Sequence, residues 1–381
     1  MKLPPPDCMA EALALARSAL LLTDPNPRVG CVIATPDGTV LGRGHTQRVG
    51  GPHAEVMALR DAASHGHSVA GATAYVTLEP CSHHGRTPPC CDALVAAGIA
   101  RVVASLADPN PLVAGRGFER LRAAGIEVEV GPGAIASRAL NPGFWSRMTR
   151  GTPWVRMKIA ASLDGRTALP DGSSQWITAE PARADGHAWR ARASAVLTGV
   201  GTVLDDDPRL DVRAIETPRQ PHLVIVDSGL ATPPAARLFE VPGRHVWIYA
   251  ARRDAERAAA LEARGATVTC LPDARGKVDL PALLRDLAAR EVNELHVEAG
   301  HKLNGSLLRE RLVDELLVYL APKLLGDGLG LANEPFAGGP LASLADAMAL
   351  EFTAIDRVGG DLRILARVAG RDASPTAPPS S

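Results

Sequence analysis

The sequence predicts an α/β protein built from two domains, on three observations. Its 381 residues are more than one core of ordinary size requires. Segments with helical apolar spacing alternate with short β-rich runs along most of the chain. This alternation fades over residues 131–151, which Pro132, Pro142 and Gly143 punctuate, and then begins afresh. We therefore predict a first domain over residues 1–148 and a second over residues 149–370.

The first domain is expected to open with a helix and a hairpin. Asp7 can cap a helix that runs to about residue 22, with one buried face formed by Met9, Leu13, Ala16 and Leu20. A β-rich run over residues 29–34, turn residues at 36–38 and a second run from residue 40 predict the hairpin. Helices are then expected from His53, from Cys90 and over residues 118–124, and strands over residues 74–78, 99–106 and 126–130. This order predicts helical layers around a largely parallel sheet.

The second domain repeats the alternation with many strands. The segments that show it are residues 154–162, 187–200, 222–228, 245–250, 266–271, 294–300 and 312–322, with a helical run over residues 282–290. Residues 371–381 are rich in Pro, Ser and Ala, so we expect a disordered tail.

The composition disfavours nucleic-acid and membrane partners. The formal net charge is -1 and aromatic residues make up 3% of the chain, whereas nucleic-acid binding favours basic surfaces and stacking aromatic rings. The chain has no apolar run of the ~20 residues that span a bilayer, and prolines replace the apolar segment of a signal peptide. We expect a soluble, cytoplasmic protein. Three of its six cysteines lie between residues 81 and 91, a clustering that favours a metal site or a reactive thiol.

Three residues from this region have the pattern of a catalytic zinc site. His53 opens a predicted helix, Cys81 follows a strand, and Cys90 opens the next helix. One imidazole and two thiolates leave the fourth tetrahedral position open for water, whose pKa zinc lowers to roughly 7. The two helix starts favour thiolate over thiol at Cys90. Glu55, two residues after the histidine, can accept the water's proton and pass it to a leaving amine.

Each of these residues also has an ordinary structural interpretation. A lone histidine at a helix start is usually a solvated cap, and a lone buried cysteine is usually a small apolar side chain. A structural zinc site would need a fourth protein ligand, for which Cys91, His83 and His84 are available. The combination of His-Ala-Glu, a strand, Pro-Cys and Pro-Cys-Cys is more specific than any part, and it favours the catalytic site.

The string EPCSHHGRTPPCCDAL resembles the cytidine-deaminase-like superfamily, and within it the pyrimidine deaminases of riboflavin synthesis. The superfamily usually separates its two cysteines by two residues, whereas here residues 82–89 intervene. The Asp-Pro-Asn-Pro motifs at residues 24–27 and 108–111 match the same branch. The resemblance places Asn26 and Asn110 near the pyrimidine, although the sequence alone allows both to be Asn-Pro turn residues.

The resemblance continues to about residue 368, through segments such as KIAASLDGRTALPDGSSQWIT and VEAGHKLNGSLL. These resemble the reductase half of the bifunctional riboflavin-biosynthesis family, whose fold is similar to dihydrofolate reductase and which uses NADPH. The resemblance implies that substrate contacts Ser174, Arg190, Leu210, Arg213 and Glu298. It implies that NADPH contacts Ala160, Trp176, Thr202, Asp206 and Ser228, together with a turn formed by Gly300, His301, Lys302, Leu303, Asn304, Gly305 and Ser306.

Without the resemblance, the second half is less specific. Gly199 and Gly201 begin a dinucleotide-binding pattern, but Leu204 occupies its third glycine position, so a plain turn is favoured. Asp205–Asp207 could bind a metal or form an exposed capping cluster. Arg190 and Arg213 could hold a phosphate through bidentate donors, and Gly300 and Gly305 would let backbone N–H groups approach one. Lys158 could be a polar group in the cleft or a charge facing solvent at a strand end.

The zinc-site pattern predicts a deaminase, and the resemblance implies a bifunctional enzyme of riboflavin synthesis. Zinc-dependent hydrolysis would deaminate 2,5-diamino-6-(5-phosphoribosylamino)pyrimidin-4(3H)-one. NADPH would then reduce the ribosyl group of 5-amino-6-(5-phosphoribosylamino)uracil to ribityl. We expect small pyrimidine phosphoribosyl substrates, no nucleic-acid or membrane partner, and a homo-oligomer. A nucleic-acid deaminase would require a basic surface and closer cysteines, and a zinc-stabilised binding protein would have no use for Glu55.

Overall fold

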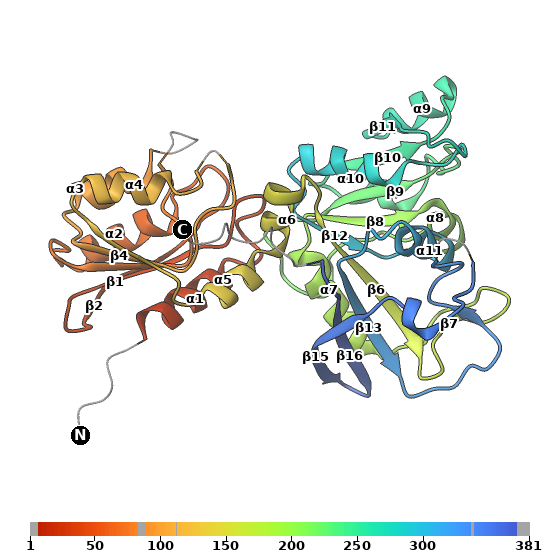
Figure 1. The fold of residues 1–381 in the computed structure, drawn as a ribbon. Coiled ribbons are helices and arrows are strands. Elements are labelled where there is room, and N and C mark those ends of the chain that lie inside the picture. The colour runs from red at the N-terminus through yellow and green to blue at the C-terminus, as the bar shows by residue number, and fades with distance from the viewer. Residues whose placement is uncertain (1–6, 83–87, 112, 337–338, 372–381) are drawn as a thin grey trace. The chain divides into compact units, whose positions relative to one another are not determined.

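The computed structural model describes residues 7–82, 88–111, 113–336 and 339–371. The chain divides into two compact units, Met1–Thr152 and Pro153–Ser381, each with its own sheet (Figure 1). The tail that we expect to be disordered lies, from residue 372 onward, outside the described residues. Within the described ranges, no helix is long and apolar enough to cross a membrane.

The first unit is a five-stranded sheet between two helical layers. Its elements are α1 (Cys8–Ser18), β1 (Gly30–Ala34), β2 (Val40–His45), α2 (Ala54–Ser64), β3 (Thr73–Val76), α3 (Cys90–Ala96), β4 (Arg101–Ala104), α4 (Arg116–Ala123), β5 (Glu127–Val130), α5 (Ala134–Leu140) and α6 (Pro142–Arg150). Helices α2, α3 and α4 pack on one face of the sheet and α1 packs on the other (Figure 1). This confirms the expected α/β/α architecture.

The sheet of the first unit is largely parallel, with one reversed strand from the opening hairpin. Its strand order is β2-β1-β3-β4-β5. The β3–β4 and β4–β5 pairs are parallel, but β1 runs antiparallel to both β2 and β3. The strands after the opening hairpin, β3, β4 and β5, confirm the expected parallel arrangement, and the hairpin adds one reversed strand, β1, inside the sheet.

Helix α1 begins as predicted and buries Met9 and Ala16 as predicted, but it ends earlier, and Cys8 and Ala12 complete its buried face in place of Leu13 and Leu20. The Asp7 carboxylate accepts hydrogen bonds from the N–H groups of Met9 and Ala10, at 3.1 and 3.0 Å. The helix ends at Ser18, and its buried residues are Cys8, Met9, Ala12 and Ala16. A Cβ on Gly30 of β1 would lie 1.9 Å from the carbonyl oxygen of Ala12. The helix therefore lies directly on β1 through small residues, which leaves the predicted Leu13 and Leu20 only half-buried.

Residues 131–151 form helices α5 and α6, although we expected regular structure to fade there. Pro142 is the first residue of α6, a position where its missing N–H costs nothing and its fixed φ suits a helix. Between the two helices, the Asn141 side chain accepts from the Arg28 N–H at 2.8 Å and donates to the Arg28 carbonyl at 3.0 Å. The two helices are thereby tied to the segment that leads into β1.

The second unit contains a nine-stranded sheet. Its elements are β6 (Trp154–Ser162), β7 (Arg166–Ala168), α7 (Glu180–Arg192), β8 (Ala195–Gly199), α8 (Val200–Asp206), β9 (His222–Val226), η1 (Arg237–Glu240), β10 (Val246–Ala250), α9 (Ala255–Glu262), β11 (Ala266–Cys270), α10 (Leu280–Ala289), β12 (Glu294–Val297), α11 (His301–Arg309), β13 (Glu315–Ala321), β14 (Leu329–Gly330), η2 (Leu344–Asp346), β15 (Leu350–Val358) and β16 (Asp361–Val368). The strand order is β11-β10-β9-β8-β12-β6-β13-β16-β15. The strands from β11 to β13 in this order are parallel, and the final hairpin is antiparallel.

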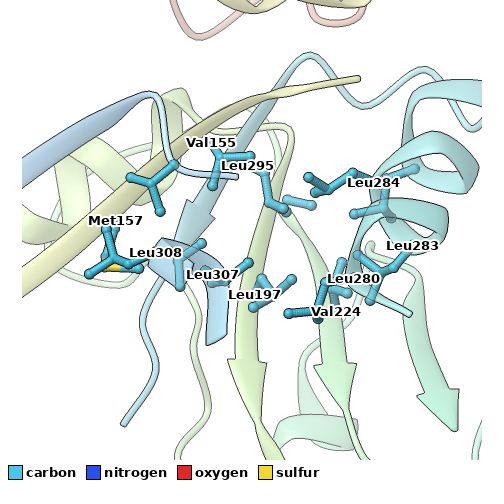
Figure 2. Packing of buried hydrophobic residues seen from close by; sticks show 14 of the residues in the cluster. Val155, Met157, Leu197, Val224, Leu280, Leu283, Leu284, Leu295, Leu307 and Leu308 are labelled. Atoms are coloured by element: carbon cyan, nitrogen blue, oxygen red, sulfur yellow. The ribbon is translucent and has the colours of Figure 1, made fainter. Parts of the chain in front are cut away.

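Helices cover both faces of this sheet. Figure 2 shows the core on one face, where Leu283 and Leu284 of α10 and Leu307 of α11 pack against strand residues such as Leu197 and Leu295. Helices α7, α8 and α9 contribute to clusters on the opposite face. The connection after β8 therefore runs over one face and the connection after β12 over the other. Such a reversal between neighbouring parallel strands opens a crevice at their carboxyl ends, where α/β sheets bind ligands.

Candidate active sites

The first unit brings together His53, Cys81 and Cys90. His53 is the N-cap of α2, Cys90 is the first residue of α3, and Cys81 lies in the segment after β3. The His53 Nδ1 atom lies 3.6 Å from the Cys81 sulfur and 3.3 Å from the Cys90 sulfur. All three ligand atoms lie within 4.8 Å of one another. Three donors at this spacing can surround one zinc ion and leave one position open.

The Cys81 sulfur accepts hydrogen bonds from Cys90. The Cys90 amide, at the start of α3, donates to the Cys81 sulfur at 3.3 Å. The Cys90 thiol also donates to the Cys81 sulfur, and this hydrogen bond is the main reason that the pKa of Cys81 falls to about 4. The pKa of Cys90 is raised by the same hydrogen bond. These hydrogen bonds favour a thiolate at Cys81 in the absence of metal, and the thiolate expected at Cys90 stays a prediction.

Glu55 lies buried next to these ligands, in the first turn of α2. Burial raises the pKa of its carboxyl to about 7, and the neighbouring Cys81 adds to the shift. A carboxyl with such a pKa can both accept and release a proton near neutral pH. Cys91 is directed elsewhere, because its thiol lies 3.2 Å from the Pro80 carbonyl oxygen and 3.5 Å from that of Gly117. It is therefore not a fourth ligand, and His83 and His84 lie outside the described residues.

Asn26 and Asn110 lie in two separate turns of the first unit. The Asn26 N–H donates to the Thr23 carbonyl at 2.8 Å. The Asn110 N–H donates to the Asp108 carboxylate at 2.8 Å, and burial raises the pKa of that carboxyl to about 7. Both asparagines are half-buried.

In the second unit, Arg190 and Glu298 form a bidentate ion pair. The Arg190 Nε and Nη2 atoms both donate to the Glu298 carboxylate, the second at 2.9 Å, and Nη1 donates to the Asp211 carbonyl at 3.0 Å. Burial opposes the Glu298 charge, but Arg190 outweighs it and holds the pKa of Glu298 well below its usual range. These Arg190 donors are therefore already hydrogen-bonded to acceptors within the protein. Arg213 is thus the better placed of the two arginines to bind a phosphate.

Leu210 and Arg213 flank a buried acidic residue that the sequence analysis did not single out. The Asp211 carboxylate accepts from Arg213 at 2.6 Å and from Arg209 at 3.0 Å. The Arg213 side chain is 57% exposed, so its remaining donors face solvent. Leu210 is buried with a φ of 49°, and its carbonyl accepts from Arg244 at 2.7 Å.

Residues 300–306 begin a helix instead of forming a glycine turn. Gly300 is the N-cap of α11, which starts at His301. Gly305 lies inside that helix, where a Cβ would come 1.7 Å from the Asn333 carbonyl oxygen. Its small size therefore serves contact with the segment after β14, and the approach of a phosphate to Gly305 stays a prediction. The uncapped first N–H groups of α11 remain suited to an anion.

The other residues expected to contact NADPH come from several segments. Ala160 is in β6, Thr202 and Asp206 are in α8, and Ser228 follows β9 by two residues. Trp176 is 63% exposed, with the Arg183 guanidinium 4.6 Å from its ring centre. Ser174 is half-buried nearby in the same loop. Gly199 ends β8 and caps α8, so the glycine pair at 199 and 201 lies at a strand-to-helix junction. Asp205 and Asp206 are exposed at the end of α8.

Lys158 and His296 add ionisable groups beneath the Arg190–Glu298 pair. Lys158 lies in the middle of β6 and is half-buried, so it is not a solvent-facing charge at a strand end. Burial lowers the pKa of its ammonium, which Glu298 partly offsets. His296 is fully buried on β12, with Nε2 3.5 Å from a Glu298 oxygen. The sequence analysis missed His296; its signal is a histidine between the apolar residues Leu295 and Val297 of a buried strand.

Comparison with known proteins places both units in one family. Residues 6–106 match the family model described as cytidine and deoxycytidylate deaminase zinc-binding region. Residues 153–363 match the one described as RibD C-terminal domain. The riboflavin biosynthesis protein RibD of Escherichia coli K12 is 48% identical over 367 residues, which cover 93% of this chain and 96% of that protein. The chain belongs to the RibD family of riboflavin biosynthesis proteins.

Solved RibD structures share the fold of the whole chain. Acinetobacter baumannii RibD has a TM-score of 0.83 at 39% identity, over 95% of this chain and 98% of that one. A Thermotoga maritima protein has the same TM-score at 33% identity, over 95% and 97% of the two chains. It is described as a diaminohydroxyphosphoribosylaminopyrimidine deaminase/5-amino-6-(5-phosphoribosylamino)uracil reductase. The bifunctional organisation expected from the sequence is thus confirmed for the RibD family.

The residues of this RibD family member also fit the two groups that such an enzyme requires. The His53, Cys81 and Cys90 donor atoms have the chemistry and the spacing for zinc. In the second unit, the uncapped start of α11 and the exposed ring of Trp176 suit the phosphates and the aromatic parts of a dinucleotide.

Proposed function

We propose that this chain catalyses two successive reactions of riboflavin synthesis, each in its own unit. The first unit deaminates 2,5-diamino-6-(5-phosphoribosylamino)pyrimidin-4(3H)-one by hydrolysis. The second reduces the ribosyl group of 5-amino-6-(5-phosphoribosylamino)uracil to ribityl with NADPH. The observation that carries the proposal is the cluster of His53, Cys81 and Cys90 with Glu55 buried beside it, in a chain that continues as a RibD reductase domain.

In the first unit, Glu55 is the residue that moves protons. His53, Cys81 and Cys90 would hold the metal. When bound, zinc supplies a water of lowered pKa that is nucleophilic at neutral pH. The Glu55 carboxylate accepts a proton from the attacking water and returns it to the departing amino group, which leaves as ammonia. Asn26 and Asn110 orient the pyrimidine from their two turns.

In the second unit, the Arg190–Glu298 pair forms the floor of the substrate site. When bound, NADPH supplies the hydride for C1′ of the ribosyl group. Glu298 and Ser174 orient the sugar, and Arg213 holds the phosphate through its exposed donors. Ala160, Trp176, Thr202, Asp206, Ser228 and the first turns of α11 hold the cofactor. We further propose that the enzyme is cytoplasmic and a homo-oligomer.

The test supplies the purified protein with the freshly made diaminopyrimidine substrate, and follows ammonia release and NADPH oxidation together. We expect ammonia without NADPH, and NADPH oxidation once the cofactor is added. Glu55→Gln should retain zinc and still reduce the deaminated intermediate. Its rate of ammonia release should fall by at least about a hundredfold. No ammonia from zinc-replete wild-type protein would contradict the deaminase assignment. Ammonia without any NADPH oxidation would contradict the reductase assignment.

A further inference from the structure

Glu79 is a buried carboxylate that the proposed mechanism leaves without a role. It lies two residues before the zinc-site residue Cys81 and is 4% exposed. Its Oε2 atom accepts from the N–H groups of Asp108 and Gly115, at 3.0 and 2.9 Å, and its Oε1 atom accepts from the N–H of Gly117 at 2.8 Å. These three donors all come from the stretch between β4 and the first turn of α4. Burial of a carboxylate costs desolvation free energy, which is offset only where its oxygens accept hydrogen bonds.

The three hydrogen bonds make Glu79 the cap of α4. Gly115 is the N-cap of that helix and has no side chain to satisfy its first N–H groups. Glu79, distant in sequence, accepts from Gly115 and Gly117 at the positive end of the helix. The fit is close, because a Cβ on Gly117 would lie 2.1 Å from the Pro80 carbonyl oxygen. The start of α4 is therefore held directly against the segment that leads into Cys81.

The loop that Glu79 holds carries Asn110. Outside position 112, which is not described, the loop is fixed at both ends by Glu79, at Asp108 and at Gly115. Between these points the Asn110 carbonyl accepts from the N–H groups of Val113 and Ala114, at 2.8 and 3.0 Å. One carboxylate thus sets the position of Asn110 relative to Cys81.

We propose that Glu79 is a positioning residue for deamination, which holds the Asn110 loop in register with the zinc-site segment. The inference rests on the proposed function, in which Asn110 contacts the pyrimidine. Glu79 itself contacts neither the metal nor the reacting atoms; it acts through the loop.

The test is Glu79→Gln in the full-length protein, because the amide keeps the shape but offers one acceptor oxygen in place of two. We expect the KM for deamination to rise on the order of tenfold to a hundredfold, with a smaller change in kcat. Zinc per chain and the kinetics of reduction should stay unchanged. Hydrogen exchange should accelerate at the amides of Asp108, Gly115 and Gly117.

Asp227→Asn is the matched control. Asp227 is a buried carboxylate of the second unit that accepts from the N–H groups of Ala231 and Thr232, at 3.0 and 2.7 Å. The same chemical change at this site should leave deamination and exchange in the Asn110 loop unchanged. Glu79→Asp, which keeps the charge on a shorter side chain, should give a smaller rise in KM than Glu79→Gln. If Glu79→Gln does not fold, Glu79→Asp still allows the KM for deamination and the hydrogen exchange of the Asn110 loop to be measured.

An unchanged KM together with unchanged exchange at the three amides would overturn the proposal. So would a loss of zinc in proportion to activity, since Glu79 would then support the ligands and not the loop. If wild-type protein releases no ammonia, the proposed function fails, yet the exchange measurement still tests how Glu79 holds the loop.

Discussion

His296 is a single side chain that should govern how the second unit responds to acid. It is fully buried on β12, and among the described residues neither ring nitrogen has a hydrogen-bond partner. Burial is the main reason that the pKa of His296 falls to about 3. The positive charges of Arg156, Arg190 and Lys158 lower it further, and Glu298 only partly compensates. Folded protein therefore keeps this imidazole neutral at pH values where the unfolded chain protonates it.

The direction of the resulting pH dependence follows from linkage. The folded pKa lies below the unfolded value of about 6.5, so the unfolded state binds the extra proton and stability falls as the pH falls below 6.5. Between pH 7 and pH 5 this residue should lower the free energy of unfolding by about 2 kcal/mol. The free energy of unfolding of His296→Val should fall less between pH 7 and pH 5, because this variant lacks the contribution of His296. Urea unfolding at both pH values, followed through the protection of β12 amides, measures it; identical pH dependence in both proteins would contradict the prediction.

At the scale of elements, the sequence predicts best where local chemistry decides the outcome. Asp7 caps α1 as expected, and the apolar runs at 154–162 and 222–226 form buried strands. The failures occur where tertiary contacts decide. Pro142 looks like a helix breaker until it is found at the first position of α6. The glycines at 300 and 305 suggest a phosphate turn, although Gly305 is a packing contact inside α11.

The site residues follow the same rule. The zinc cluster was predictable because its residue types and spacing are specific, and the structure brings the three ligand atoms together. Glu79 was not, because the backbone N–H groups that its carboxylate accepts from come from a distant segment. Asp211 was missed although Arg209 and Arg213 are only two residues away, because the sequence does not show that its carboxylate is buried between them. His296 carries a sequence signal, and Glu298, two residues on, is expected on the same face of the strand, but nothing in the sequence shows that Arg190 lies near them.

The packing role of Gly305 gives a prediction for α11. Its Cβ would lie 1.7 Å from a backbone oxygen, so Gly305→Ala must displace the segment around Asn333 and should lower the free energy of unfolding by about 1–3 kcal/mol. Gly186 is the matched control, because it is inside α7 with nothing within 4 Å of its Cβ position. Gly186→Ala should stabilise the protein by up to about 1 kcal/mol. Urea midpoints compare the three proteins, and equal stability of both variants would rule out the packing role.

At the scale of the whole molecule, each unit has its own core and its own chemistry. The residues proposed for deamination, including His53, Cys81 and Cys90, lie within Met1–Thr152. The residues proposed for reduction, including Arg190 and Glu298, lie within Pro153–Ser381. The core beneath the zinc cluster and the core of the nine-stranded sheet share no residue. Loss of metal should therefore affect one reaction and spare the other.

Chelation of zinc in the full-length protein tests this independence. We expect dialysis against a chelator to abolish ammonia release, because the described part of the chain offers no other group of three ligands that could hold the metal. Oxidation of NADPH with 5-amino-6-(5-phosphoribosylamino)uracil should continue at its original rate, and added zinc should restore ammonia release. Glu55→Gln serves as the control, because it should lose the same reaction while it keeps its metal. If reduction fell in step with zinc content, the second unit would depend on the metal-bound state of the first, and the separation argued from the two cores would be wrong.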